Sequence, residues 1–156
     1  KMEIERKYLV NKILWQVLHY PVNAIFIQQA YLSTDPKCTV RIRITDSKAL
    51  ITIKGESKGI SRKEFEYYVP LNDGLEIIRL AGTPLIIKRR YVIRHKGYNW
   101  EVDEFLGDNE GLILAEVELN SDTENPEWPE WIDKDVSGDP RYFNLQLAIN
   151  PINNWQ

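Results

Sequence analysis

Charged side chains recur two residues apart along this chain, and that spacing restricts the folds it can adopt. The first example is Glu3, Glu5 and Lys7, which occupy alternate positions near the start. In a β-strand, residues two apart point to the same face of the sheet. One face of this first strand therefore carries two carboxylates and an ammonium group. We expect a sheet with one strongly charged face.

The same spacing recurs in six later segments. These pairs are Arg41 and Arg43, Thr52 and Lys54, Glu64 and Glu66, Lys88 and Arg90, Glu101 and Asp103, and Glu116 and Glu118. The residues between them are largely apolar, as a face that packs against a core or a covering helix requires; they include Ile4, Ile42, Ile53, Phe65, Val102 and Val117. A solvated face would explain any single pair. Seven such segments in one small domain indicate a common site.

These charges are also separated by sign. The carboxylates fall on the first, fifth, seventh and eighth expected strands, and the cations mainly on the third, fourth and sixth. Eight carboxylates and six cations leave this set with a net charge of −2. If the sheet closes, unbalanced charges inside it are costly. One or two divalent cations such as Mg²⁺ or Mn²⁺, with a phosphate-rich anion on the Arg and Lys groups, would balance them.

Strand patterns dominate the rest of the chain. Eight strands are expected, over residues 2–10, 25–34, 38–46, 48–55, 61–69, 85–95, 98–105 and 112–120. Short turns between several of them favour an antiparallel sheet or barrel. Three helices are expected, over residues 11–18, 73–81 and 139–149. Pro21 should end the first, and Asp139 and Pro140 should begin the last.

A polar segment at residues 121–129 is expected to be a loop. Trp128 and Trp131 should anchor it against the body of the protein.

Composition narrows the class of protein. The chain has 156 residues, 43% of them hydrophobic, which fits one domain with one sizeable core. Its net charge of −3 argues against a general nucleic-acid binder. Cys38 is the only cysteine, so a disulfide within the chain and a cysteine zinc cluster are excluded. His19 and His95 lack metal-ligand spacing, and no apolar run reaches membrane-spanning length. We expect a cytoplasmic protein with no membrane partner.

Taken together, these segments resemble the CYTH superfamily, also called the triphosphate tunnel metalloenzymes. The resemblance rests on the N-terminal Glu-x-Glu-x-Lys at residues 3–7, on the paired-charge segments in family order, and on residues 134–142 with Asn144, which resemble the short bacterial branch. Ala30 departs from the glycine expected there. The resemblance implies one domain over residues 1–156. It would be α+β but predominantly β: an eight-stranded antiparallel closed barrel around a triphosphate tunnel, with a few flanking helices.

The resemblance also implies roles for the charged residues. The metal ligands would be Glu3, Glu5, Glu116, Glu118 and Asp103. The catalytic cations would be Lys7, Arg41, Arg43, Lys54, Lys88 and Arg90, joined in substrate binding by Thr52 and Lys134. Water or metal would be oriented by Glu64, Glu66 and Glu101. The expected activity is hydrolysis of inorganic triphosphate to pyrophosphate and phosphate, with two Mg²⁺ or Mn²⁺ ions.

Other functions stay open at this point. Within the same family they are a class IV-type adenylate cyclase, a thiamine triphosphatase or another organic triphosphatase. These need a surface for a ring, and Tyr31, Tyr91 and Trp100 would either stack on one or pack in the core. A non-catalytic polyphosphate-binding module would keep the cations and could dispense with the carboxylates, whose presence favours an enzyme. A homodimer also stays open.

Overall fold

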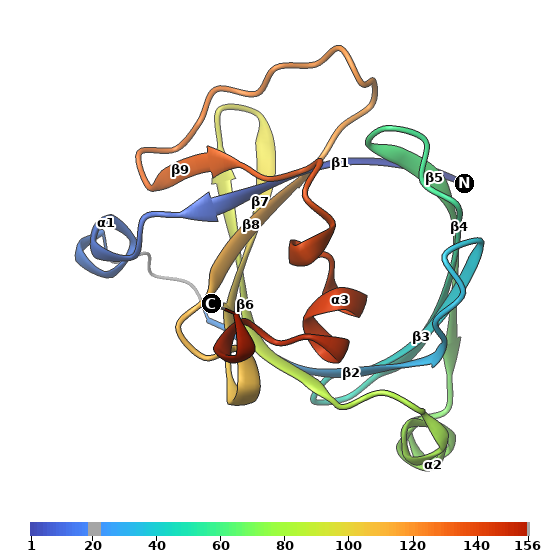
Figure 1. The fold of residues 1–156 in the computed structure, drawn as a ribbon. Coiled ribbons are helices and arrows are strands. Elements are labelled where there is room, and N and C mark those ends of the chain that lie inside the picture. Colours follow the sequence, from blue (N-terminus) through green and yellow to red (C-terminus); the bar gives the residue numbers. More distant parts are fainter. Residues whose placement is uncertain (19–22, 156) are drawn as a thin grey trace.

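Nine antiparallel strands, found within residues 1–18 and 23–155 that this computed structural model describes, form one sheet that curls into a ring (Figure 1). They are β1 (Met2–Val10), β2 (Ile25–Ser33), β3 (Cys38–Ile44), β4 (Ala49–Gly55), β5 (Ser61–Val69), β6 (Ile86–His95), β7 (Tyr98–Phe105), β8 (Ile113–Glu118) and β9 (Ile132–Asp135). The order along the sheet is β5-β4-β3-β2-β6-β7-β8-β1-β9, and β5 also pairs with β1. That last pairing closes a ring of the eight predicted strands.

The first strand, β1, makes the closure. Its residues Met2 to Ile4 pair with β5, and its residues Glu5 to Leu9 pair with β8 on the opposite edge. The end of β1 then pairs with β9, which takes over the edge that β5 leaves. The short strand β9 was not predicted and is an addition to the ring.

The helices are short and differ in part from expectation. The elements are α1 (Lys12–Val17), α2 (Leu71–Ile77) and α3 (Asn144–Ile149), with single 3₁₀ turns η1 (Ile78–Leu80), η2 (Gly107–Asn109), η3 (Pro140–Tyr142) and η4 (Ile152–Asn154). Asn11 caps α1 by accepting a hydrogen bond from the backbone N–H of Leu14 at 3.0 Å. The predicted end of this helix at Pro21 lies outside the described residues.

The single helix predicted over residues 139–149 was wrong. Asp139 and Pro140 do begin a turn, with the Asp139 carboxylate accepting from the backbone N–H of Arg141. Phe143, however, has extended backbone with ψ 138°, which separates this turn from α3. The break allows the chain to change direction between η3 and α3.

The apolar core lies mainly outside the ring, because the inward positions carry charge. Its largest cluster packs the outer faces of β1, β7 and β8 against α1 and the segment before β9, with Tyr8, Trp100 and Trp131 at its centre. Trp131 is fully buried, as an anchor should be, whereas Trp128 is 47% exposed and meets Tyr8 edge-on.

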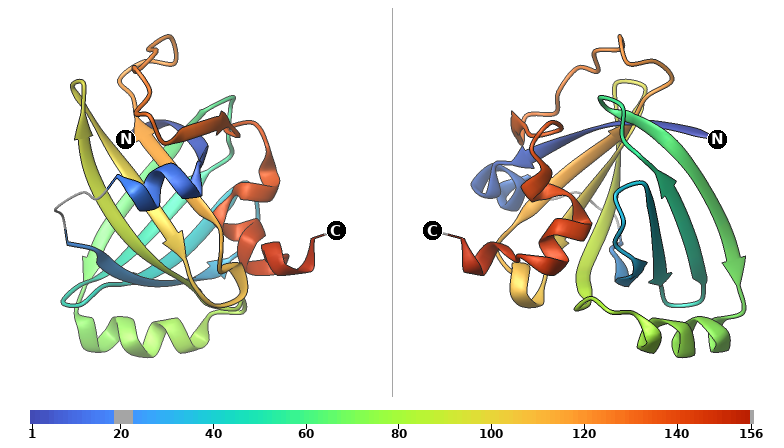
Figure 2. Two further views of the ribbon diagram at one scale, coloured as in Figure 1. Left: turned by 90° about the vertical axis from the view of Figure 1, so that its left-hand side faces the viewer. Right: turned by 45° about the vertical axis from the view of Figure 1, so that its right-hand side comes forward.

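A second apolar cluster lies inside the ring at one end. Ile86, Phe105 and Leu114, on inward positions of β6, β7 and β8, contact Leu147 and Ala148 of α3. In Figure 1 the view is down the ring, with α3 inside its outline, and Figure 2 shows the same segment at one end. The C-terminal segment therefore packs into that end of the ring.

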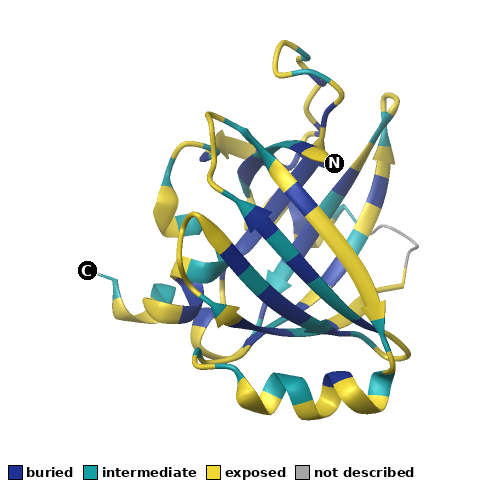
Figure 3. Cartoon of the chain, turned by 90° about the vertical axis from the view of Figure 1, so that its right-hand side faces the viewer, coloured by how far each residue is buried: buried dark blue, intermediate teal, exposed yellow. Residues whose placement is uncertain are grey.

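The outer face of β5 is the exception to the predicted covered outer surface. Val102 and Val117 are buried as expected, but Phe65 is 44% exposed and Tyr67 is 59% exposed. Figure 3 shows β5 as a largely exposed strand, with α2 crossing below the strand ends. Within the described residues, no helix is both long and apolar enough to cross a membrane.

Gly74 is where α2 comes closest to the ring. A Cβ built at this position would lie 2.3 Å from the Cβ of Ala49 and 2.9 Å from Cδ1 of Ile44. We expect Gly74→Ala to destabilise the protein although alanine favours a helix by about 1 kcal/mol over glycine, because methyl groups that close force the helix away from the sheet. Overpacking of this kind costs about 1–3 kcal/mol.

Thermal unfolding measures this effect. Each kcal/mol corresponds to about 2–4 °C in a domain of this size. Gly82→Ala is the matched control, because nothing lies within 4 Å of the added methyl there. A melting temperature of Gly74→Ala above that of the wild type, as the helix propensity of alanine alone would give, would show that α2 does not rest on β3 and β4 at this contact.

Candidate functional site

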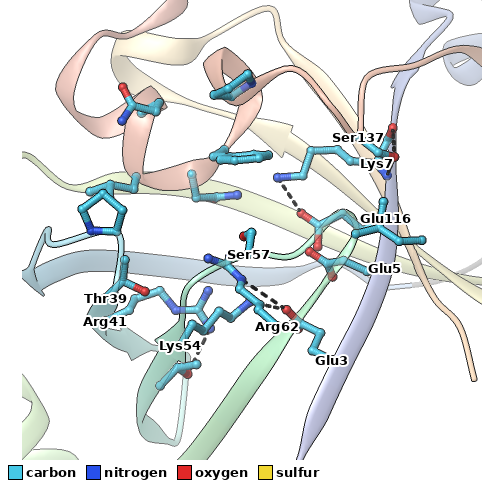
Figure 4. Close-up of a pocket in the computed structure, with 18 of the residues that line it drawn as sticks. Glu3, Glu5, Lys7, Thr39, Arg41, Lys54, Ser57, Arg62, Glu116 and Ser137 are labelled. Carbon is cyan, nitrogen blue, oxygen red and sulfur yellow. Dashed lines mark hydrogen bonds and ion pairs between the residues drawn. The ribbon is translucent and has the colours of Figure 1, made fainter. Parts of the chain in front are cut away.

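The ring encloses a cavity of about 350 Å³, within the usual range for small-molecule sites. Alternate residues of the strands point into it, as the two-residue spacing predicted. Ten of the predicted site residues line it: Glu3, Glu5, Lys7, Arg41, Arg43, Thr52, Lys54, Lys88, Arg90 and Glu116. Figure 4 shows several of these side chains converging from different strands. The sheet therefore brings together most of the predicted site.

Carboxylates from β1 and β8 gather on one side of the cavity. Lys54 donates a hydrogen bond to Glu3 at 2.8 Å, and the Nζ of Lys7 lies 3.4 Å from Glu116. The register places Lys7 directly opposite Glu116. Of the three lining carboxylates on β1 and β8, Glu3 and Glu116 are thus held by lysines.

Glu5 lies between these two ion pairs and, among the described residues, makes no ion pair of its own. Burial first, and then the charges of Glu116 and Glu3, raise its pKa to about 8. The Glu5 carboxylate therefore lacks a cationic partner that would balance its negative charge. A cation placed beside Glu5 would supply it.

Cations crowd the facing wall on β3 and β6. Burial lowers the pKa of Lys88 to about 7, and Arg90 and Arg43 add to the effect against the opposing charge of Asp103. Burial likewise lowers the pKa of Arg43 to about 9, with further contributions from Arg41 and Arg90. This wall has an excess of positive charge. An anion in the cavity would relieve the repulsion.

Asp103 lies behind this wall and holds it together. Arg90 binds its carboxylate through two hydrogen bonds of 2.8 and 2.9 Å, and the Nζ of Lys88 lies 2.8 Å away. Burial would raise the pKa of Asp103, but the charges of Arg90 and Lys88 outweigh it and lower the pKa. Asp103 does not line the cavity; its contacts are those of a counterion to the two cations.

The other predicted carboxylates also lie outside the lining. Glu64 is buried 3.4 Å from Lys54, Glu66 accepts a hydrogen bond from the hydroxyl of Thr52 at 2.8 Å, and Glu101 lies 3.0 Å from Arg90. Each contacts a residue that does line the cavity. Their role in orienting water or metal stays a prediction.

Two predicted residues are separated from the cavity. Glu118 has a side chain that is 56% exposed, and it pairs with Lys1 at 3.2 Å. Lys134 is exposed on β9. Neither belongs to the cavity lining.

Several lining residues were not among those predicted. They include Thr39, Glu56, Arg62, Ser137 and Phe143. Tyr31, which the sequence offered for stacking on a ring, and Asn144, which the family resemblance included, line the cavity as well. Arg62 lies two residues before Glu64 and therefore on the same face of β5, so the two-residue spacing could have identified it. The residues from 137 to 144 carry no such spacing, because a turn and not a strand brings them to the ring.

The carboxylates of the cavity fit a metal ion that takes few protein ligands. Within the part of the chain that the structure describes, no three His, Cys, Asp or Glu side chains form a ready metal cluster. Mg²⁺ commonly takes only one or two protein carboxylates and completes its shell with water and phosphate oxygens. Glu5 and its neighbour Glu116, both ionisable and both lining the cavity, fit that requirement.

The molecule is thus a closed antiparallel ring in which cations and carboxylates face one cavity. The CYTH domain model matches residues 1–143, and the chain belongs to this family. Two curated relatives are both named inorganic triphosphatase. The protein from Acetivibrio thermocellus is 41% identical over 155 residues, covering 99% of this chain and 97% of its own length. The protein from Nitrosomonas europaea is 31% identical over 152 residues, covering 95% and 97%.

A solved structure agrees with these relatives. The crystal structure of the inorganic triphosphatase NE1496 superposes with a TM-score of 0.66 at 29% identity, covering 94% of this chain and 97% of that chain. The predominantly β, ring-forming fold predicted from the sequence is thereby confirmed.

Removing the Asp103 charge should destabilise the fold. We expect Asp103→Asn to cost about 3–5 kcal/mol, because it leaves Lys88 and Arg90 buried without their shared counterion. The melting temperature in a thermal scan measures the loss. Glu101→Gln is the control, because Arg90 keeps Asp103 in that variant and the side chain of Glu101 is 41% exposed. A melting temperature for Asp103→Asn equal to that of the control would contradict the counterion role.

Glu5→Gln should have the opposite effect on the metal-free protein. Folding raises the pKa of Glu5 from an ordinary 4.5 to about 8, so stability associated with this group is present below pH 4.5 and is lost as the pH rises towards 8. Glutamine avoids that loss. With EDTA present, the variant should melt above the wild type at pH 7.5 and at the same temperature near pH 4. Glu76→Gln, exposed on α2, is the control. A lower melting temperature at pH 7.5 would contradict the prediction.

Proposed function

We propose that this protein hydrolyses inorganic triphosphate to pyrophosphate and phosphate with the help of Mg²⁺ or Mn²⁺. The observation that carries the proposal is the division of the cavity into a cationic wall and a carboxylate wall. Two relatives that match this chain over nearly their whole length bear the name inorganic triphosphatase. The cavity is roughly the size of a small ligand, and its excess positive charge suits a compact polyanion.

The cations would bind the triphosphate. Arg41, Arg43 and Arg90 present guanidinium groups, which match phosphate oxygens through paired hydrogen bonds. Lys7, Lys54 and Lys88 add point charges. As charge develops on the oxygens of the departing pyrophosphate, groups already fixed in place stabilise it without reorganisation. The ion pairs with Asp103 and Glu3 would hold three of the cations ready: Lys88, Arg90 and Lys54.

The carboxylates would hold the metal. Glu5 and Glu116 are the leading pair, and Glu3 can join them if Lys54 turns to the substrate or to Glu64. A bound Mg²⁺ or Mn²⁺ ion supplies Lewis acidity to phosphoryl oxygens and lowers the pKa of bound water. Two ions stay a prediction, as do Glu118 and Asp103 as ligands. A cytoplasmic location and a homodimer also stay predictions.

An organic triphosphate is the nearest alternative substrate. Of the three aromatic residues considered for stacking on a ring, Trp100 is fully buried in the outer cluster, and Tyr91 packs against Trp15. Tyr31 alone lines the cavity. Only one of the three predicted stacking residues therefore supports a cyclase or a thiamine triphosphatase.

Phosphate release from inorganic triphosphate tests the proposal. Assays would contain Mg²⁺ or Mn²⁺, with EDTA as the metal-free control, and ATP, pyrophosphate and thiamine triphosphate in parallel. We expect metal-dependent release that is fastest from inorganic triphosphate. Turnover or cyclisation of ATP without triphosphate hydrolysis would move the function to the cyclase class. Tight triphosphate binding with no turnover of any substrate would indicate a binding module.

Glu5→Gln separates the metal role from folding. This variant should lose most of the metal-dependent rate, because loss of a ligand removes part of the Lewis-acid contribution, and it should stay folded. Glu76→Gln should retain wild-type turnover. A Glu5→Gln variant with unchanged turnover would remove Glu5 from the metal site.

A further inference from the structure

Two amide side chains connect the cationic wall to the C-terminal segment. Gln29 on β2 is fully buried, and its Oε1 accepts a hydrogen bond from the Nε of Arg43 at 2.9 Å. The Nε2 of Gln29 donates to the Oδ1 of Asn144 at 2.9 Å. The Nζ of Lys88 donates to the same Oδ1 at 3.0 Å. Two substrate-binding cations are therefore joined through two neutral amides.

Arg43 and Lys88, the donors at the two ends of this series of hydrogen bonds, fix the orientation of both amides. Arginine and lysine can only donate hydrogen bonds, so the atom that each faces must be an oxygen. Arg43 therefore sets the oxygen of Gln29 towards itself and the NH₂ group towards Asn144. Lys88 and Gln29 both donate to the second amide, so its oxygen must face them. These contacts fix the orientation of the Asn144 amide.

This leaves the NH₂ group of Asn144 for another partner. Asn144 lines the cavity, and among the described residues its Nδ2 makes no hydrogen bond. Phe143, immediately before it, has extended backbone, and this break between η3 and α3 sets Asn144 at the first position of α3. The residue reaches the cavity only because the predicted long helix is interrupted.

We propose that Asn144 binds the substrate directly, with its NH₂ group donating to a phosphate oxygen, while Gln29 acts as the positioning residue that keeps this group turned towards the cavity. The inference deepens the proposed function and rests on it. A neutral donor suits this place, because Lys88, Arg90 and Arg43 already repel one another there. An amide adds a hydrogen bond to phosphate without adding a fourth positive charge.

Asn144→Asp tests the substrate contact. Aspartate keeps an oxygen for Lys88 and Gln29 but has no donor for phosphate. With inorganic triphosphate and Mg²⁺, we expect KM to rise roughly 10- to 100-fold, the usual effect of losing a hydrogen bond to a charged group, with no fall in melting temperature. Asn153→Asp is the matched control: it makes the same change on an exposed residue of the C-terminal turn. A wild-type KM in Asn144→Asp would overturn the proposal.

Gln29→Glu tests the positioning role without altering Asn144. Glutamate still accepts from Arg43 but cannot donate to the oxygen of Asn144. The Asn144 amide then keeps only one of its two orienting donors, Lys88, and the new carboxylate attracts its NH₂ group away from the cavity. We expect KM to rise as in Asn144→Asp, and the double variant to be no worse than either single variant, because both remove the same contact. Additive effects would overturn the coupling between the two residues.

A spectroscopic measurement separates a substrate contact from a structural role. The side-chain NH₂ signals of Asn144 can be assigned by their absence from the ¹H–¹⁵N spectrum of Asn144→Asp. Adding inorganic triphosphate with EDTA to the wild type should shift them, and the signals of Asn153 should not move. If triphosphate binds and these signals stay in place, Asn144 is not a ligand. If the wild type neither binds nor hydrolyses triphosphate, the proposed function itself fails.

Discussion

The structure depends on one electrostatic constraint: charges of both signs face inward from a closed sheet and have to be balanced with little help from water. Lys88 illustrates it, since its side chain is almost wholly buried and its counterion Asp103 is equally inaccessible. Burying a charge is tolerable only when it is paired and hydrogen-bonded. The inner face is therefore a network in which each cation has a carboxylate or an amide behind it. The main apolar core is displaced to the outside of the ring, where α1 and the segment before β9 cover it.

Segments near the two ends of the chain close the ring. β1 pairs with β5 over only three residue pairs, and β9 takes the same edge further along. Ser137, just beyond β9, accepts a hydrogen bond from the backbone N–H of Lys7 at 2.8 Å, and the carbonyl of Tyr142 accepts one from the Nζ of Lys7 at 3.1 Å. The segment that completes the sheet thus also fixes a lysine of the cavity. Folding of the tail and assembly of the site are coupled.

The two-residue period of the charged residues predicts part of this arrangement. The period states which side chains share a face, and it placed Glu3, Lys54 and Arg90 correctly in the cavity lining. It does not state the register between strands. Arg90 and Asp103 are direct partners in the ladder between β6 and β7, so the Asp103 carboxylate pairs with Arg90 and is not among the residues that line the cavity. Glu118 has the same parity as Glu116, yet it lies at the end of β8, where the side chain is exposed.

The tail was the least predictable part for a different physical reason. The run from Asp139 to Ile149 has a helix start and apolar groups at suitable spacing, so local propensity favours one helix. Tertiary contacts override it: Leu147 and Ala148 gain burial against β6 to β8 only if α3 turns into the end of the ring, and that turn needs the extended backbone at Phe143. The same turn brings Asn144 to the cavity. Its position depends on the extended backbone at Phe143, which the local sequence pattern does not predict. It also depends on an amide partner more than 100 residues earlier in the chain.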